Sequence, residues 1–322
     1  MTTRIQTVTG PVDIHALGLI LPHEHLFTDL RGPLVAGYAQ AESGAVVRVL
    51  ERYLDEASAA GVTALVECST VGVGRNLRIL SRLAEISPIH IIAPTGVYRE
   101  AFTPPSLREI SEADLADLWI RELTQGIEGT SIRAGFIKLA MSDDGPTALE
   151  IQNLKAAAKA SQITGAVIAS HTIGGEVARK EMDVLEEAGL DLHRFIWVHA
   201  QTETDPTVLM KSARRGAYLE LDSVGAPYQS QTDLLETTLA MIAAGYADQL
   251  LLSHDAGWYN PARPDGLPEE GFRGYTALTK EFIPVLLERG ITEEQVWLIT
   301  VDNPARAFAF QLADSVRNSD TC

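Results

Sequence analysis

The sequence predicts an α/β protein built as a (β/α)8 TIM barrel, and three observations carry that prediction. Eight short runs rich in β-forming residues alternate with longer helix-like stretches. Most of these runs are apolar without interruption, as in HIIAPTGVY and QLLLSHD, which is typical of parallel strands covered on both faces. The length of 322 residues suits one such barrel. An open doubly wound sheet is the alternative.

The elements can be placed in order along the chain. Helix-like segments such as 45–60 (AVVRVLERYLDEASAA) and 149–162 separate the strands. Glycine follows several of the helical segments, at the position where a left-handed residue commonly ends a helix; the examples are Gly61, Gly165, Gly216 and Gly245. The expected strands are residues 19–25, 63–70, 90–98, 134–141, 166–172, 195–201, 217–224 and 249–255.

Segments outside the eight units are expected to complete a single domain that spans the whole chain. Residues 1–18 predict a short hairpin or lid over the bottom of the barrel. Near the other end, Thr292 and Gln295 form a capping-box pattern. Asn303 and Pro304 predict the N-cap and first residue of an extra C-terminal helix.

Composition restricts the partners of the protein. The formal net charge is −17, from 43 acidic and 26 basic residues, and no basic cluster exists that would bind nucleic acid or an anionic membrane. No apolar run reaches transmembrane length, and the first residues lack the apolar core of a signal peptide. Two cysteines, Cys68 and Cys322, offer no disulfide framework. We expect a cytoplasmic protein with a small-molecule substrate and a homodimer as its assembly.

Chemically active side chains gather at the carboxyl ends of the expected strands, where TIM barrels place their active sites. His23 and His25 end the first strand in LPHEHL, and their spacing of two puts both on one face. His171, His199 and Asp255 end strands five, six and eight. A single histidine at a strand end is more often structural. Four of them with an aspartate predict a site for divalent ions such as Zn²⁺, Mn²⁺, Fe²⁺ or Co²⁺.

The other histidines are expected to be structural. His15, His90 and His193 lie in the N-terminal lead or at the amino ends of strands. His254 precedes Asp255, so alternation directs one of the two into the barrel, and periodicity alone leaves open which one.

Lys138 lies inside the apolar fourth strand, GFIKLAM. A charged ammonium group there would carry a large desolvation cost. A neutral amine can react with CO₂ to give a carbamate, an anion whose two oxygens can bridge two metal ions. The alternative is a lysine that points outward and reaches the solvent. An inward orientation predicts a two-metal site.

This set of residues resembles the phosphotriesterase family of the amidohydrolase superfamily. The resemblance rests on the ordered set of six ligands, the opening LPHEHL, VECST in the second strand and DNPARAF near the end. It implies a hydrolase with two divalent metal ions, zinc being favoured over manganese, cobalt or iron. The implied ligands are His23, His25 and Asp255 for the more buried ion and His171 and His199 for the exposed one.

The resemblance also implies catalytic roles. Carbamylated Lys138 would bridge the two ions together with a hydroxide, which attacks the substrate. Asp255 would accept the proton and pass it on. The lactonase branch of the family carries a tyrosine at the end of strand three, and GVYRE places Tyr98 there as a further catalytic and substrate-binding residue.

Two positions depart from the dedicated phosphotriesterases, which carry an aspartate after the strand-six histidine and a histidine at the end of strand seven. This sequence has Thr202 and Ser223 there, and neither can relay a proton near neutral pH. Many lactonases have an arginine where Ser223 stands. We expect lactones or other carboxylic esters as substrates, with at most weak phosphotriesterase activity.

Loops are expected to determine specificity. The loop 257–274 is long, rich in Gly and Pro, and contains aromatic residues that favour an ordered pocket wall. Its two arginines are expected either to bind an anionic substrate group or to be solvated. The predicted substrate-binding residues are Tyr98, Arg99, Tyr228, Trp258, Arg263 and Arg273.

Two other functions remain open at this point. The protein could be a true phosphotriesterase (aryldialkylphosphatase), which a comparison of phosphotriesters with lactones would reveal. It could also be a binding protein that keeps its metal ions without turnover. The complete ligand set argues against the second, because a degenerate barrel would be expected to lose ligands.

Overall fold

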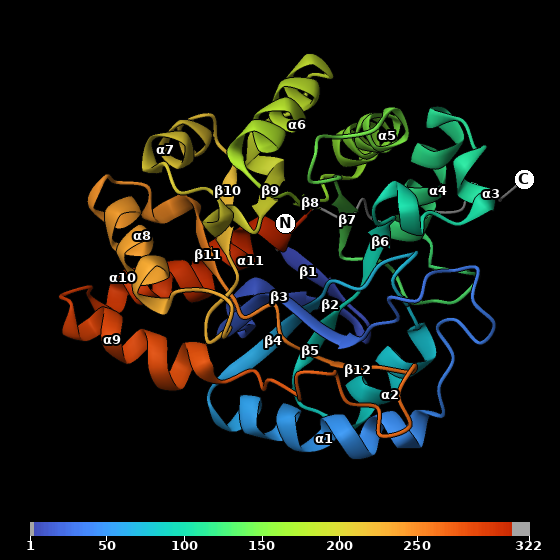
Figure 1. The fold of residues 1–322 in the computed structure, drawn as a ribbon, viewed down its shortest axis with the longest axis horizontal. Helices are drawn as coiled ribbons and strands as arrows, with labels where there is room; N and C mark the ends of the chain where they lie inside the picture. Colours follow the sequence, from blue (N-terminus) through green and yellow to red (C-terminus); the bar gives the residue numbers. More distant parts are fainter. Residues whose placement is uncertain (1–2, 311–322) are drawn as a thin grey trace, which may run out of the picture.

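Parallel strands form a closed barrel at the centre of the computed structural model, which describes residues 3–310, and helices surround it (Figure 1). The strands are β3 (Leu19–Phe27), β4 (Val62–Glu67), β5 (His90–Ile92), β6 (Pro94–Gly96), β7 (Phe136–Ala140), β8 (Ile168–His171), β9 (Phe195–Val198), β10 (Tyr218–Leu221), β11 (Leu250–Leu252) and β12 (Gly257–Tyr259). β3 to β5 pair in order, β6 to β11 pair in order, and β12 pairs with β3. The predicted (β/α)8 barrel is therefore confirmed, and the open sheet was the wrong alternative.

The third and eighth predicted strands are each interrupted. β5 and β6 are separated by Ala93, whose carbonyl oxygen accepts a hydrogen bond from Gly135 at 2.8 Å. Between β11 and β12 the backbone still pairs with the first strand, because the Asp255 amide donates to the His23 carbonyl at 3.2 Å. The sixth strand ends earlier than predicted, since His199 takes a left-handed φ of 63°.

The helices that cover the barrel follow the expected boundaries closely. The segment expected at 149–162 is α5, which begins with a capping box between Thr147 and Glu150 and ends at Gly165 with a φ of 80°. No described helix has the length and apolar character that a membrane crossing requires. The helices are α1 (Ser43–Ala59), α2 (Leu77–Ile86), α3 (Pro105–Arg108), α4 (Glu112–Thr124), α5 (Ala148–Thr164), α6 (Gly175–Glu187), α7 (Pro206–Arg214), α8 (Gln231–Ala243), α9 (Ile283–Glu288), α10 (Glu293–Trp297) and α11 (Asn303–Phe308).

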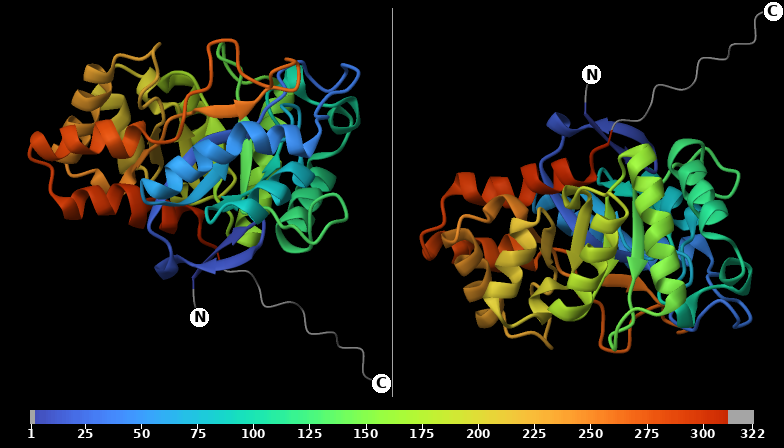
Figure 2. Two further views of the ribbon diagram at one scale, coloured as in Figure 1. Left: turned by 90° about the horizontal axis from the view of Figure 1, so that it is seen from below. Right: turned by 90° about the horizontal axis from the view of Figure 1, so that it is seen from above.

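The N-terminal lead closes the bottom of the barrel, as predicted. β1 (Arg4–Thr7) and β2 (Gly10–Asp13) form an antiparallel hairpin. Ile5 of this hairpin is fully buried in the cluster that fills the lower barrel, and the Val8 amide donates to the Ile91 carbonyl at 2.8 Å. Figure 2 shows the hairpin at one end of the barrel and the segment that contains β12 at the other.

The extra C-terminal helix is present as α11, but the prediction that Asn303 is its N-cap was wrong, because Asn303 is already helical. The predicted capping box of Thr292 and Gln295 starts α10. A π-helical turn (Leu298–Asp302) joins α10 to α11, so Asn303 is helical on both sides. Its side-chain amide donates to the carbonyl oxygens of Ala247 and Leu250 at 2.7 and 2.8 Å. The asparagine anchors the helix to the start of β11 and does not cap it.

Candidate active site

A cavity of about 160 Å³ lies at the carboxyl ends of the strands. Its walls include Tyr98 and Trp258 and the apolar side chains of Leu30 and Val73. The strand ends bring together in it all six side chains that were predicted as metal ligands: His23, His25, Lys138, His171, His199 and Asp255.

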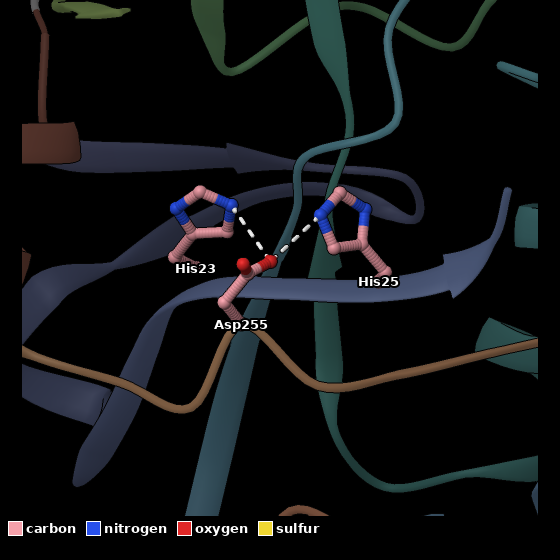
Figure 3. A group of neighbouring side chains, drawn as sticks. All are labelled: His23, His25 and Asp255. Atoms are coloured by element: carbon pink, nitrogen blue, oxygen red, sulfur yellow. Dashed lines mark ion pairs between the residues drawn. The ribbon is translucent and has the colours of Figure 1, made fainter. Parts of the chain in front are cut away.

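The first half of the site is formed by His23, His25 and Asp255 (Figure 3). A single carboxylate oxygen, Oδ1 of Asp255, lies 3.5 Å from His23 Nε2 and 3.1 Å from His25 Nε2. Burial alone would raise the pKa of the Asp255 carboxyl group, but the hydrogen bond from His25 and the nearby imidazoles hold it well below its ordinary value. Asp255 is therefore an ionised carboxylate between two imidazoles, and the three side chains could hold a metal ion.

The second half is formed by His171 and His199. His171 Nδ1 lies 2.7 Å from His199 Nε2, and the two rings meet edge to face. Burial, and then the neighbouring His199, lower the pKa of His171 well below its ordinary value, so its imidazole is neutral. The two ring nitrogens approach one another closely, so they could bind one divalent cation if each presented its lone pair.

Lys138 connects the two halves. It lies in β7 with its side chain directed into the cavity and is only 1% exposed, so it does not reach the solvent. Its Nζ has no hydrogen-bond partner. A buried amine without a partner is costly, whereas a carbamate at this position would have four imidazoles and a carboxylate around it to hold two cations. These residues fit a two-metal centre.

Asp222 was not among the residues predicted from the sequence; it lies at the carboxyl end of β10 and is fully buried. One oxygen accepts a hydrogen bond from His199 Nδ1 at 2.8 Å, and the other lies 3.2 Å from His23 Nδ1. Burial favours the neutral acid, but His199 and His23 hold the pKa of Asp222 well below its ordinary value. The sequence LELDS could have indicated this residue, because Glu220 and Asp222 share one face of the strand, as His23 and His25 do in LPHEHL.

The open question at His254 and Asp255 is resolved by Glu24. His254 points away from the cavity, and its Nδ1 lies 2.6 Å from Glu24 Oε1. The same carboxylate accepts hydrogen bonds from the Ser253 hydroxyl and from the amides of His254 and Ala256. Glu24 comes from the first strand, so it joins the first strand to the eighth and directs Asp255 inward.

Backbone geometry also distinguishes this site. Five non-glycine residues in the described part of the chain have a positive φ. Three of them, His199, Asp255 and Trp258, line this cavity. Such conformations persist only where the surroundings hold them, and they cluster at functional sites.

Tyr98 and Arg99 lie beside His171. The Tyr98 hydroxyl is 3.3 Å from His171 Nδ1, and burial raises the pKa of Tyr98 to about 12, so the phenol is neutral. A guanidinium nitrogen of Arg99 contacts His171 Nε2 and lies 2.5 Å from Asp143 Oδ1. The Nε of Arg99 is buried without a hydrogen-bond partner.

The remaining predicted specificity residues occupy different places. Tyr228, Trp258 and Arg273 line a second cavity of about 370 Å³ that shares Asp255 and Trp258 with the first. Arg273 donates hydrogen bonds to the backbone carbonyls of His254 and Asp255. These bonds hold its guanidinium group against the segment that follows β11. Arg263 lines neither cavity and lies 3.5 Å from Asp265.

The two departures from the phosphotriesterase pattern lie outside the metal-ligand cavity. Thr202 accepts a hydrogen bond from the Gly174 amide and donates to the His199 carbonyl. Ser223 is buried, and its hydroxyl has no partner. Neither residue lines the cavity.

Comparisons with known proteins agree with this geometry. The model of the phosphotriesterase family matches residues 3–308. A phosphotriesterase homology protein of Mycobacterium tuberculosis is 31% identical over 326 residues, which cover 95% of this chain and 98% of that protein. An N-acetyltaurine hydrolase of Tetraodon nigroviridis is 31% identical over 352 residues, 97% of this chain and 99% of that protein. A mutant PTE-like lactonase of Deinococcus radiodurans superposes with a TM-score of 0.86 at 32% identity, covering 94% and 99% of the two chains.

Proposed function

The chain belongs to the phosphotriesterase family of metal-dependent hydrolases, and from this premise we propose that it hydrolyses lactones and related carboxylic esters at a two-metal site. The observation that carries the proposal is the convergence of six donor side chains on one cavity, with the amine of Lys138 buried among them and unpartnered. Divalent ions held there would act as Lewis acids and activate water for attack on a carbonyl carbon. Zinc is the ion we favour, since imidazole and carboxylate ligands suit it.

The residues of the chain supply the rest of the reaction. Asp255 is ionised and about a quarter exposed, so it can accept a proton in the cavity and release it to solvent. The Tyr98 hydroxyl keeps its proton and can donate a hydrogen bond to the substrate oxygen on which negative charge develops. Leu30, Val73 and Trp258 give the cavity apolar walls that exclude bulk water.

A lactone suits this arrangement better than a phosphotriester. Ring opening leaves the alkoxide on the same molecule, where the bound ions can stabilise it. A phosphotriester with a detached leaving group benefits from a proton relay. The positions that would carry the relay hold Thr202 and Ser223, which cannot relay a proton near neutral pH and do not line the cavity. The similarity to a PTE-like lactonase supports the same choice.

The proposal is tested by kinetics on one metal-loaded preparation. We expect kcat/KM for γ- and δ-lactones to exceed that for paraoxon-like phosphotriesters by at least ~100-fold, a difference of about 3 kcal/mol in transition-state stabilisation. A preference for the phosphotriesters would overturn the proposal and establish a true phosphotriesterase. Absence of turnover on lactones, esters, amides and phosphotriesters would leave only a binding protein.

A second candidate substrate is an N-acylated amine that carries an anionic group. The observation that favours it is the Arg99 guanidinium beside His171, with its Nε buried and unpartnered, because such a donor can hold a carboxylate or sulfonate. A relative of similar length acts on N-acetyltaurine, as its name states. N-acetyltaurine and N-acetyl amino acids therefore belong in the same panel. A kcat/KM for them above that for lactones, with KM raised in Arg99→Met, would select this candidate.

A further inference from the structure

Three of the four histidines in the site have their outer ring nitrogen beside a group that can accept a hydrogen bond. For His23 the group is Asp222, with 3.2 Å between His23 Nδ1 and the carboxylate. His25 Nδ1 lies 2.8 Å from the Ser69 hydroxyl, and His199 Nδ1 lies 2.8 Å from Asp222. Such partners fix the tautomer and the orientation of a metal-binding histidine.

His171 is the exception. Its inner nitrogen, Nδ1, is the one that approaches His199 Nε2 at 2.7 Å. Its outer nitrogen, Nε2, contacts the guanidinium group of Arg99, which can only donate hydrogen bonds. In this arrangement Nε2 is the acceptor and the ring proton lies on Nδ1.

That arrangement is incompatible with metal binding by His171. A ligating Nδ1 must present its lone pair, which places the proton on Nε2. An Nε2–H group cannot face an N–H group of Arg99, because neither has a lone pair to offer. Loading of the site therefore requires Arg99 to leave Nε2 and an acceptor to take its place.

Asp143 is positioned to be that acceptor. It lies in the turn after β7, and its Oδ1 is 4.0 Å from His171 Nε2 and 2.5 Å from the same guanidinium nitrogen of Arg99. The carboxylate has two oxygens, so it can keep Arg99 on one and accept from His171 on the other. A shift of about 1 Å brings the His171–Asp143 distance to that of a charge-assisted hydrogen bond.

We propose that Asp143 is the positioning residue for His171 when the site binds metal ions, and that Arg99, which contacts the same ring nitrogen of His171, opposes that binding. The inference rests on the two-metal site proposed above. A carboxylate behind the imidazole raises its basicity and holds its ring in the ligating orientation. Arg99 competes with the metal ion, because it stabilises the wrong tautomer.

The test measures metal affinity and not turnover. Full-length protein is stripped of metal and titrated with Zn²⁺ in competition with a chromophoric chelator. Asp143→Asn should weaken one of two sites by about 10- to 100-fold, and Asp143→Glu should recover part of that loss. Asp144→Asn is the matched control, because it removes the same charge from the adjacent exposed position. Arg99→Met should tighten the same site that Asp143→Asn weakens.

Each outcome either supports or overturns the proposed roles of Asp143 and Arg99. Equal Zn²⁺ affinities in Asp143→Asn and Asp144→Asn would overturn the role of Asp143. An unchanged or weaker affinity in Arg99→Met would overturn the competition and leave an ordinary ion pair between the two residues. If the wild-type protein bound fewer than two Zn²⁺ ions per chain, the proposed two-metal function would fail first, and the two failures are thus distinguishable.

Discussion

Asp222 accepts a hydrogen bond from His199 Nδ1 at 2.8 Å while its second oxygen lies 3.2 Å from His23 Nδ1. The two histidines belong to different halves of the site, so one buried carboxylate orients a ligand in each half. Its pKa is held low by those histidines, which keeps it an acceptor on both sides. The two halves are consequently coupled through the end of β10.

Replacement of Asp222 should therefore weaken both halves together. Asp222→Asn keeps the volume but offers one acceptor oxygen instead of two, and we expect Zn²⁺ affinity to fall about 10- to 100-fold. Inductively coupled plasma mass spectrometry after equilibrium dialysis measures the loss. Asp117→Asn is the control, since it makes the same replacement at an exposed position of α4. Full metal content in Asp222→Asn would contradict the assignment.

Lys138→Ala should abolish measurable turnover. The substitution removes the amine that carries the carbamate and leaves a hollow between the two halves of the site. A short carboxylate such as acetate or propionate can enter that hollow and replace the carboxylate group that the carbamate would supply, so part of the hydrolytic rate should return. Activity is assayed against carboxylate concentration. Lys155→Ala, on the exposed face of α5, should behave as wild type with and without acetate. Undiminished turnover in Lys138→Ala would eliminate the carbamate.

Stability should fall as pH rises because of Glu181, whose pKa is raised to about 8 by burial. Its carboxyl group lies between the hydroxyl groups of Ser170 and Thr172, on either side of His171. Above pH 4.5 the unfolded chain releases the proton while the folded chain retains it, so the unfolding free energy decreases until about pH 8. The total decrease in unfolding free energy from this group is at most about 5 kcal/mol.

Urea unfolding between pH 5 and pH 9 measures this dependence. Glu181→Gln, which resembles the protonated acid, should flatten the decline, because its side chain no longer titrates. Glu187→Gln removes an exposed carboxylate from the same helix and should leave the slope unchanged. Identical slopes in wild type and Glu181→Gln would show that another group is responsible.

The barrel and the convergence of the six predicted ligands on one cavity were predictable, because both follow local periodicities. Apolar runs identify buried parallel strands, and a spacing of two places side chains on one face. His23 with His25 illustrates this, and Lys138 was informative because a cation is rare in such a run. These patterns also predicted the end at which the site opens, since the carboxyl ends of all the parallel strands lie at the same end of a barrel.

The features that were not predicted from the sequence depend on contacts between residues that are distant in the chain. Asn303 looked like an N-cap, and only the position of Ala247 and Leu250 explains why it lies inside a helix. Glu24 and Asp222 each bind groups on other strands, and periodicity indicates a face but not which strand stands opposite. The early end of β9 depended on the left-handed backbone at His199, which a residue of that type adopts only under tertiary constraint.

Removal of the Glu24 carboxylate should destabilise the protein where the first and eighth strands of the barrel meet. Glu24→Ala leaves the amides of His254 and Ala256 and the Ser253 hydroxyl without their acceptor. Because these buried groups would be left unsatisfied, we expect the unfolding free energy to fall by about 3–5 kcal/mol. Chemical denaturation measures it. Glu112→Ala, at the exposed start of α4, is the comparison and should cost under ~1 kcal/mol. Equal losses of unfolding free energy in the two variants would mean that the junction of the first and eighth strands does not depend on Glu24.

Tyr98→Phe should reduce catalysis without affecting metal content. The variant keeps the ring that packs against Phe102 and His171 and loses only the hydroxyl. If that hydroxyl stabilises charge on the substrate oxygen, kcat should fall about 10- to 100-fold while KM changes little, because the interaction forms mainly in the transition state. Steady-state kinetics on one lactone provides the measurement, and Tyr259→Phe, which lies outside the metal-ligand cavity, is the control. A rise in KM with kcat unchanged would assign Tyr98 to ground-state binding, and loss of bound metal would assign it to the support of His171.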